Sequence, residues 1–410
     1  AADDAIAVYL SSRQVNAIRW LAGTRKLLAG TSGGEWWLDG GGADEAMDAT
    51  ATIRRHLDSE NGSSSVKPAL IGNTVMFLQR LARTVREFYY DWQVDQYVAN
   101  NISILSEHLT NRASITALAW QQFPHQILWA LRSDGKLLSM TYMREHDVTA
   151  WAQHAVAGTD AEVESIATIE GAEEDELWAI VKRTIDSSTK RYIERLSPLV
   201  VIENGNGDTE DWELEDAFFV DSGLTYRGTE IATVTGLDHL EGETVVALAD
   251  GGVETGLTVN SGSVTLSRAA GVIHIGLNYY SDLESLWPIH RDKEGLMFGY
   301  PQRITNAILL LYRTAGGLIG PNNADLYEID YPEGYGVTAE ERVTRDGSRR
   351  VTRGGDTRIT RTTGITAYDY YTGFTEDMAL EVGADYYPTV YIRQDEPLPM
   401  TITAIVTDIK

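Results

Sequence analysis

The sequence predicts a mainly β protein, built of β-propeller-like repeats with an inserted small β-barrel and a C-terminal region of β-strands. Three observations lead to this prediction. A pattern of strand, aromatic residue and tight turn recurs about every fifty residues in the first half. Short alternating strands joined by glycine turns follow residue 228, and longer apolar strands follow residue 303.

The recurring pattern is an apolar strand, an aromatic residue, a tight turn and a second apolar strand. It occurs in these segments: 15–38, 68–78, 115–138 and 163–181. In the first and third segments a tryptophan precedes a leucine at the same spacing, Trp20 with Leu28 and Trp120 with Leu128. A repeat of roughly 40–50 residues made of short strands is typical of a propeller blade. A β-sandwich with chance spacing is the alternative.

Length, charge and composition limit the possible classes. The chain has 410 residues, enough for roughly two or three domains. It has no cysteine, which excludes disulfides, thiol nucleophiles and thiolate metal sites. A net charge of −26 argues against a conventional nucleic-acid-binding protein, which needs a basic face. No apolar run is long enough for a transmembrane helix.

The predicted domains follow these changes of pattern. Residues 1–198 hold the blades, and because the chain opens on Ala1 we expect them to be incomplete at the N-terminus. Residues 199–227 are a linker and a strand, in which the acidic stretch Glu203–Asp211 lacks the ligand order of a calcium loop. Residues 228–276, with Asp-Gly, Gly-Gly and Ser-Gly turns, are the inserted barrel. Residues 277–410 form a C-terminal β domain that returns to the main body.

An arginine-rich repeat with a period of eight residues is predicted to form a hairpin at 340–364. It is a basic patch on an acidic chain, which predicts contact with DNA phosphate or with an acidic neighbouring subunit. A self-paired hairpin with solvated charges is the alternative. The candidate contact residues are Arg345, Arg349, Arg350, Arg353, Arg358 and Arg361.

The sequence predicts no enzyme, cofactor or metal site. Gly30–Gly34 matches the nucleophile-elbow pattern, but Glu35–Leu38 reads as a strand and not as the helix that this chemistry needs. The histidines are scattered singly, and no carboxylate pair stands out. Four tryptophans at blade positions are predicted to be core residues and not sugar platforms: Trp120, Trp129, Trp151 and Trp178.

Several of these segments together resemble the tail nozzle family of short-tailed, podovirus-type bacteriophages, also called tail tubular protein B or tail stabilisation protein. The segments are 15–37, 115–122, 128–135, 138–145, 174–178, 191–196 and 397–401. Residues 236–266 are similar to a small β-barrel module of phage tails. The arginine repeat departs from the family.

The resemblance implies a structural virion protein without an active site or cofactor. It implies a homo-hexameric tube in the tail that closes the DNA channel until infection and then conducts the genome. The implied partners are the tail adaptor (the head-to-tail connector), tail fibres or tip proteins, and translocating DNA that is bound without sequence specificity. A glycan- or receptor-binding propeller at the tail tip, which needs exposed aromatic platforms, is the alternative. A propeller-based hydrolase, with convergent carboxylates at the channel, is a third hypothesis.

Overall fold

In the computed structural model, 59% of the described residues are in strands and 5% in helices, which confirms the mainly β prediction. The described residues are 8–10, 16–40, 47, 53–172, 174–197, 214–288, 291–292, 295–296, 301–332, 337–338, 366–368, 370–380 and 385–409. The chain forms two compact units. Unit 1 comprises 1–156, 160–183 and 190–196, and unit 2 comprises 157–159, 184–189 and 197–410.

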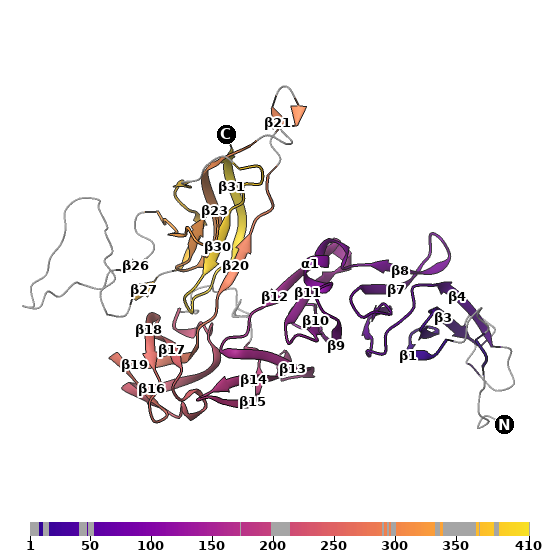
Figure 1. Ribbon diagram of the computed structural model, residues 1–410, viewed down its shortest axis with the longest axis horizontal. Helices are drawn as coiled ribbons and strands as arrows, with labels where there is room; N and C mark the ends of the chain where they lie inside the picture. Colours follow the sequence, from indigo (N-terminus) through magenta and orange to yellow (C-terminus); the bar gives the residue numbers. More distant parts are fainter. Residues whose placement is uncertain are drawn as a thin grey trace, which may run out of the picture. The chain divides into compact units, whose positions relative to one another are not determined.

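Antiparallel sheets follow one another along the first half of the chain, and in each of them strands that are consecutive in sequence pair with each other (Figure 1). Sheet 1 contains β1 (Ile18–Gly23), β2 (Leu27–Thr31), β3 (Gly34–Asp39) and β4 (Arg54–Ser59). Sheet 2 contains β5 (Ala69–Ile71), β6 (Thr74–Leu78), β7 (Val85–Asp91) and β8 (Gln96–Asn101). Sheet 3 contains β9 (Ile115–Gln121), β10 (Ile127–Arg132), β11 (Leu137–Met143) and β12 (Val148–His154). Sheet 4 contains β13 (Thr159–Glu170), β14 (Asp175–Ile185) and β15 (Ser188–Arg195).

Three hydrophobic cores of unit 1 lie between successive sheets, and a fourth cluster packs residues 8, 10, 47 and 53 against sheet 1. On β6, Val75 and Phe77 pack against residues of sheet 1, whereas Met76 and Leu78 pack against residues of sheet 3. Side chains alternate between the two faces of a strand, so β6 is buried on both sides. Trp129 and its neighbours on sheet 3 pack against sheet 4 in the same way. Sheets 1 to 4 are therefore stacked face to face, with an apolar layer in each interface.

The four tryptophans that the sequence predicts as core residues contribute to these layers to different degrees. Trp129 is only 2% exposed, which confirms its predicted core position. Trp120 and Trp151 are half-buried and pack against the core between sheets 2 and 3. Trp178 is also half-buried, and its indole N–H donates a hydrogen bond to Glu176.

The first sheet of unit 2 is open. It contains β16 (Asp221–Thr235), β19 (Ser263–Leu277), β17 (Thr244–Ala249), β18 (Gly252–Thr258), β27 (Thr366–Tyr368) and β26 (Val337–Thr338), in that order. The strands expected over 228–276 are present, but they do not close into a barrel, because the outer edge of β18 pairs with β27 and not with β16. No closed barrel occurs in the part of the chain that the structure describes.

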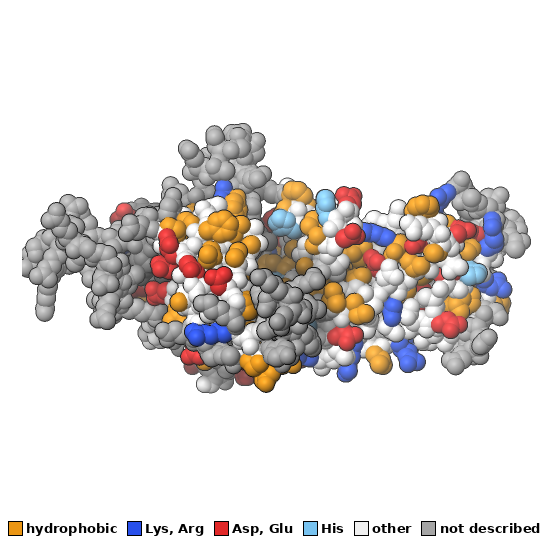
Figure 2. Space-filling model, turned by 90° about the horizontal axis from the view of Figure 1, so that it is seen from above, with side chains coloured by type: hydrophobic (Ala, Val, Ile, Leu, Met, Phe, Trp, Pro, Cys, Tyr) orange, Lys and Arg blue, Asp and Glu red, His pale blue; other side chains and the backbone are white. Residues whose placement is uncertain are grey.

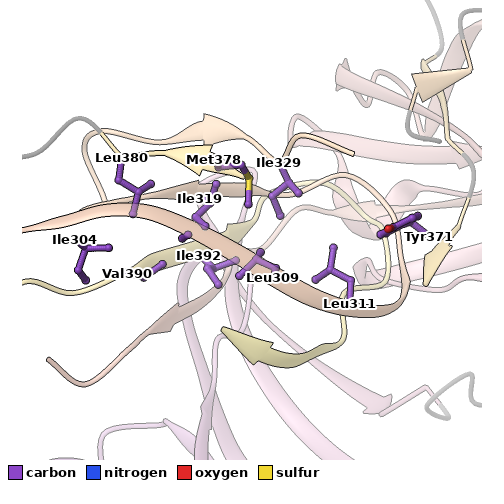
Figure 3. Close-up of a cluster of buried hydrophobic side chains, with 11 residues drawn as sticks. Ile304, Leu309, Leu311, Ile319, Ile329, Tyr371, Met378, Leu380, Val390 and Ile392 are labelled. Atoms are coloured by element: carbon purple, nitrogen blue, oxygen red, sulfur yellow. The ribbon is translucent and has the colours of Figure 1, made fainter. Parts of the chain in front are cut away.

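The remaining strands of unit 2 enclose a separate core (Figure 3). One sheet has the order β20 (Ser281–Glu284), β30 (Tyr391–Gln394), β24 (Leu318–Gly320) and β25 (Tyr327–Glu328). In the other, β23 (Ile304–Thr314) pairs with β28 (Tyr371–Phe374), β29 (Met378–Ala379) and β31 (Ile402–Ile409). A short ribbon joins β21 (Arg291–Asp292) to β22 (Gly295–Leu296). Buried side chains of both sheets, including Leu309, Ile319 and Ile392, form the core.

Helical segments are short and lie in the connections. They are η1 (Ile104–Ser106), α1 (Glu107–Thr110), η2 (Arg144–His146), η3 (Leu214–Asp216) and η4 (Asp238–Leu240). No helix among the described residues is long and apolar enough to cross a membrane.

Candidate functional site

Each interface between successive sheets of unit 1 contains a backbone hydrogen bond of the same kind. In each, a backbone carbonyl at the end of the second strand of a sheet, or in the turn after it, accepts a hydrogen bond from the next sheet or from the chain that leads into it. The donor and acceptor pairs are Ser63 N to Thr31 O at 2.7 Å, Ile115 N to Ala82 O at 2.6 Å and Val163 N to Gly135 O at 2.9 Å. The acceptors therefore lie at similar places in sheets 1 to 3, whereas the donors lie before, at the start of or inside the first strand of the next sheet.

Gly135 lies at a close approach between sheets 3 and 4. Its φ of +74° lies in the left-handed region, and a Cβ there would come within 2.5 Å of the Cβ of Glu162 and 3.0 Å of its Cα. Gly135→Ala is expected to lower the free energy of unfolding by about 1–3 kcal/mol, because backbone strain and a collision add together. Thermal unfolding checks this.

Gly72→Ala is the matched control for Gly135→Ala. Gly72 also has a positive φ, of +56°, but a Cβ there would meet nothing within 4 Å. Gly72→Ala should lower the free energy of unfolding by less than Gly135→Ala does, because only the backbone strain remains. Equal losses in the two variants would contradict the close approach of sheets 3 and 4.

Glu35 is a fully buried carboxylate at the interface of sheets 1 and 2. Its side chain accepts hydrogen bonds from the Ser63 hydroxyl at 2.8 Å and from the Ser59 hydroxyl. Burial raises the pKa of Glu35, and bonds from Ser59, Ser63 and the Asn61 backbone, with the charge of Arg86, offset part of that effect. A raised pKa is a property of catalytic acids. Here, however, the carboxyl group is 0% exposed and holds the segment that leads into sheet 2.

Glu35→Gln should make the stability of unit 1 less dependent on pH. The native state keeps the proton of Glu35 above its usual pKa of 4.5, whereas the unfolded chain has lost it. Stability therefore falls as pH rises from 4.5 to the raised native pKa, with a slope of at most about 1.4 kcal/mol per pH unit. Denaturant unfolding at a series of pH values should show this fall in the wild type and not in the glutamine variant.

Glu241→Gln serves as a control of opposite sign. Backbone N–H groups of Gly262 and Ser261 hydrogen-bond to Glu241 and hold its pKa below the usual value. The stability that this glutamate contributes is present at neutral pH and is lost as pH falls through the lowered pKa.

Parallel pH profiles of the wild type and Glu35→Gln would contradict the burial of the Glu35 carboxyl group.

Polar contacts also join the other sheets. Tyr142 on sheet 3 donates a 2.7 Å hydrogen bond to Glu87 on sheet 2, and burial together with this carboxylate raises the pKa of Tyr142. Between sheets 3 and 4, the Asp175 carboxylate accepts backbone N–H bonds from Gln122 at 2.7 Å and Phe123 at 3.0 Å. Tyr142 and Glu87 are buried and satisfy each other, as buried polar groups require, whereas the bonds to Asp175 lie at exposed positions.

The candidate catalytic and metal-binding features lie apart from one another in the part of the chain that the structure describes. No group of three or more histidine, aspartate or glutamate side chains among the described residues could hold a metal ion. The buried glutamates Glu35 and Glu87 lie in different interfaces and do not converge. Gly30–Gly34 joins β2 to β3 as a hairpin turn, as the sequence predicts. The arginine repeat and its candidate residues at 345, 349, 350, 353, 358 and 361 lie outside the described residues.

The surface combines charged and apolar groups. Figure 2 shows acidic and basic side chains interspersed with apolar ones on the face in view. Exposed aromatic residues occur, but not at the blade tryptophans. Examples are Trp92 on the β7–β8 turn, which is 78% exposed, and Phe123 between β9 and β10, which is 58% exposed. In unit 2, Tyr280 is 57% exposed, Tyr386 59% and Tyr387 64%.

No protein-family model matches the chain, and no curated protein matches it significantly. Functional interpretation therefore depends on the residues and on the geometry described above.

Sequence reasoning missed the interface residues. Glu35 reads as one more residue of a strand, because it stands between Gly34 and Trp36 in an otherwise apolar run. The available signal was the charge itself, since an ionisable residue in a strand that is buried on both faces needs a specific partner.

Proposed function

We propose that the protein is a structural component of the tail of a short-tailed bacteriophage. In this proposal sheets 1 to 4 are blades of a β-propeller, and copies of the chain assemble, as a hexamer, into the nozzle of the tail. The nozzle joins the tail adaptor, carries fibres or tip proteins, retains the packaged genome and conducts DNA at ejection. The observation that carries the proposal is the repeated interface of unit 1.

The repeated interface suits a part that bears load. Each sheet is fixed to the next by a buried apolar layer and by backbone hydrogen bonds whose acceptors lie at similar places in sheets 1 to 3. Close-packed interiors have low compressibility and transmit strain, so such a stack resists deformation. The buried polar groups serve the same contacts, which is typical of a rigid body and not of a catalytic pocket.

The charge of the chain suits contact with moving DNA. A net charge of −26 repels phosphate and disfavours non-specific adhesion. DNA can then pass along a wall of this kind without being held by it. The arginine repeat at 340–364 remains a candidate for contact with DNA or with a neighbouring subunit.

A gene-deletion experiment tests the proposed function. Particles grown without this protein, and with it supplied from a plasmid, are compared for nuclease-protected DNA. We expect heads without the protein to lose their packaged DNA and the plasmid copy to restore it. Heads that stay filled but no longer adsorb to cells would instead support the receptor-binding alternative, which the exposed Trp92, Tyr386 and Tyr387 favour.

A further inference from the structure

Among the described strands, sheet 4 has one strand fewer than the sheets before it. Sheets 1, 2 and 3 each have four strands and end on an outermost strand, β4, β8 or β12, whereas sheet 4 ends on its third strand, β15. The position equivalent to β4, β8 and β12 is thus vacant beside β15 among the described strands. An open strand edge presents unpaired backbone N–H and C=O groups, which is a template for another strand.

The exposed edge at β15 is basic, although the chain as a whole is acidic. The strand carries Lys190, Arg191 and Arg195 against Glu194. Arg191 is bound to Glu164 by hydrogen bonds of 2.7 and 2.9 Å, and Arg195 forms an ion pair with Glu176. Lys190 is exposed and forms no ion pair with a described residue, so it is the charge that this edge offers to a partner. Ile193 is 73% exposed, so the edge is also apolar in its centre.

A second open edge, of opposite charge, lies in unit 2. All residues of β20 are exposed, and this strand is at the edge of its sheet. Its charged residues are Asp282 and Glu284, and its Leu283 is 39% exposed. Arg393 on β30 fixes Asp282 through bonds of 2.6 and 3.0 Å, which holds the strand in place. Glu284 has no basic side chain opposite it, because its partner across the strand pair is Tyr391.

We propose that β20 of one copy of the chain pairs with β15 of the next copy and supplies the fourth strand of sheet 4. Backbone hydrogen bonds between the two edges would give the affinity, as in other cases of strand addition. Lys190 and Glu284 supply the charge complementarity, which selects this edge over others. The contact joins two different surfaces, so it is head-to-tail and can close copies into a ring. It rests on the proposed function, in which copies of the chain form a tube.

Exchange of the two charges tests this contact. Lys190→Glu and Glu284→Lys are prepared separately in the full chain, and self-association is measured by analytical ultracentrifugation. Each variant alone should associate about tenfold more weakly than the wild type, because like charges directly opposite each other in a strand pair are destabilising. An equimolar mixture of the two variants should recover wild-type association, because each mixed contact then pairs Glu with Lys.

Two matched variants control for the change of charge alone. Lys67→Glu changes another exposed lysine, and Glu328→Lys changes an exposed glutamate on β25, at the opposite edge of the same sheet as β20. Both should associate like the wild type. The recovery in the mixture also shows that the two test variants are folded.

Distinct results overturn the contact and the proposed function. The β15–β20 contact alone is overturned if the wild-type chain associates and the single variants associate equally well. The same conclusion follows if the single variants associate weakly and their mixture does not recover wild-type association. A wild-type chain that remains monomeric at every concentration tested overturns the contact and also the assembly on which it rests. The gene-deletion experiment reports on genome retention independently of which strands meet.

Discussion

Leu128→Ala should lower the free energy of unfolding of unit 1 by about 2–5 kcal/mol, the range for a buried leucine that leaves a cavity. Leu128 is 0% exposed on β10, where it lies opposite Trp120 and Met140 in the two adjacent strands. It belongs to the apolar layer between sheets 2 and 3, together with Met76 and Ile115. Because residues of both sheets pack against Leu128, the cavity left by Leu128→Ala can be filled only if one of the two sheets moves. Denaturant unfolding followed by tryptophan fluorescence measures the loss.

Leu105→Ala is the control for Leu128→Ala, since it makes the same chemical change in the same unit. Leu105 is 92% exposed in η1, so its truncation should change stability by less than about 0.5 kcal/mol. A small effect of Leu128→Ala, similar to that of the control, would show that sheets 2 and 3 do not share a core.

Arg183→Met should cost about 2–4 kcal/mol, because it leaves a carboxylate without its partner. The Arg183 side chain is 0% exposed and that of Glu194 is 19% exposed. The two form paired hydrogen bonds between β14 and β15, of which Nη2 to Oε2 is 3.0 Å. Breaking a buried pair from one side costs about 3–5 kcal/mol, and the partial exposure of Glu194 reduces this figure.

The double variant Arg183→Met/Glu194→Leu distinguishes the effect of the Arg183–Glu194 ion pair from the effect of other contacts of Arg183. Replacement of both partners by apolar residues removes the unpaired charge, so it should recover most of the stability lost in Arg183→Met. Arg191→Met, which breaks the exposed pair with Glu164, should leave stability unchanged within error. A double variant as unstable as Arg183→Met would mean that Arg183 acts through contacts other than Glu194.

Local patterns predict the strands well because they reflect side-chain alternation and turn residues. Gly135 marks the β10–β11 turn, and the apolar run that begins at Ile304 becomes β23. Pairing between distant segments is not visible in such patterns. The barrel prediction failed for this reason, since β27, at residues 366–368, takes the edge of β18.

Equal spacing in the sequence does not guarantee equal packing. Trp120 lies opposite Leu128, as the repeat suggests, but Trp20 lies opposite Gly30. The register is set at the turn, where Gly23 pairs with Leu27 in sheet 1 but Gln121 pairs with Ile127 in sheet 3. A Cβ on Gly30 would come within 2.1 Å of the Trp20 ring. The glycine therefore makes room for the buried indole, which the spacing alone could not reveal.

The candidate site was less predictable than the strands. Glu35 and Ser63 meet only because sheets 1 and 2 stack, and their separation in the chain conceals the contact. The open edges of β15 and β20 likewise become apparent only when the strand order of each sheet is known. Charge and composition indicate what kind of surface the chain has, but not which strands it leaves unpaired.

Immunogold labelling of intact particles, with antibody raised against this chain, tests the central claim most directly. The account predicts label confined to the short tail below the head, at a constant position from particle to particle. Label absent from particles, with the protein recovered only in the soluble fraction, would contradict a structural role in the tail.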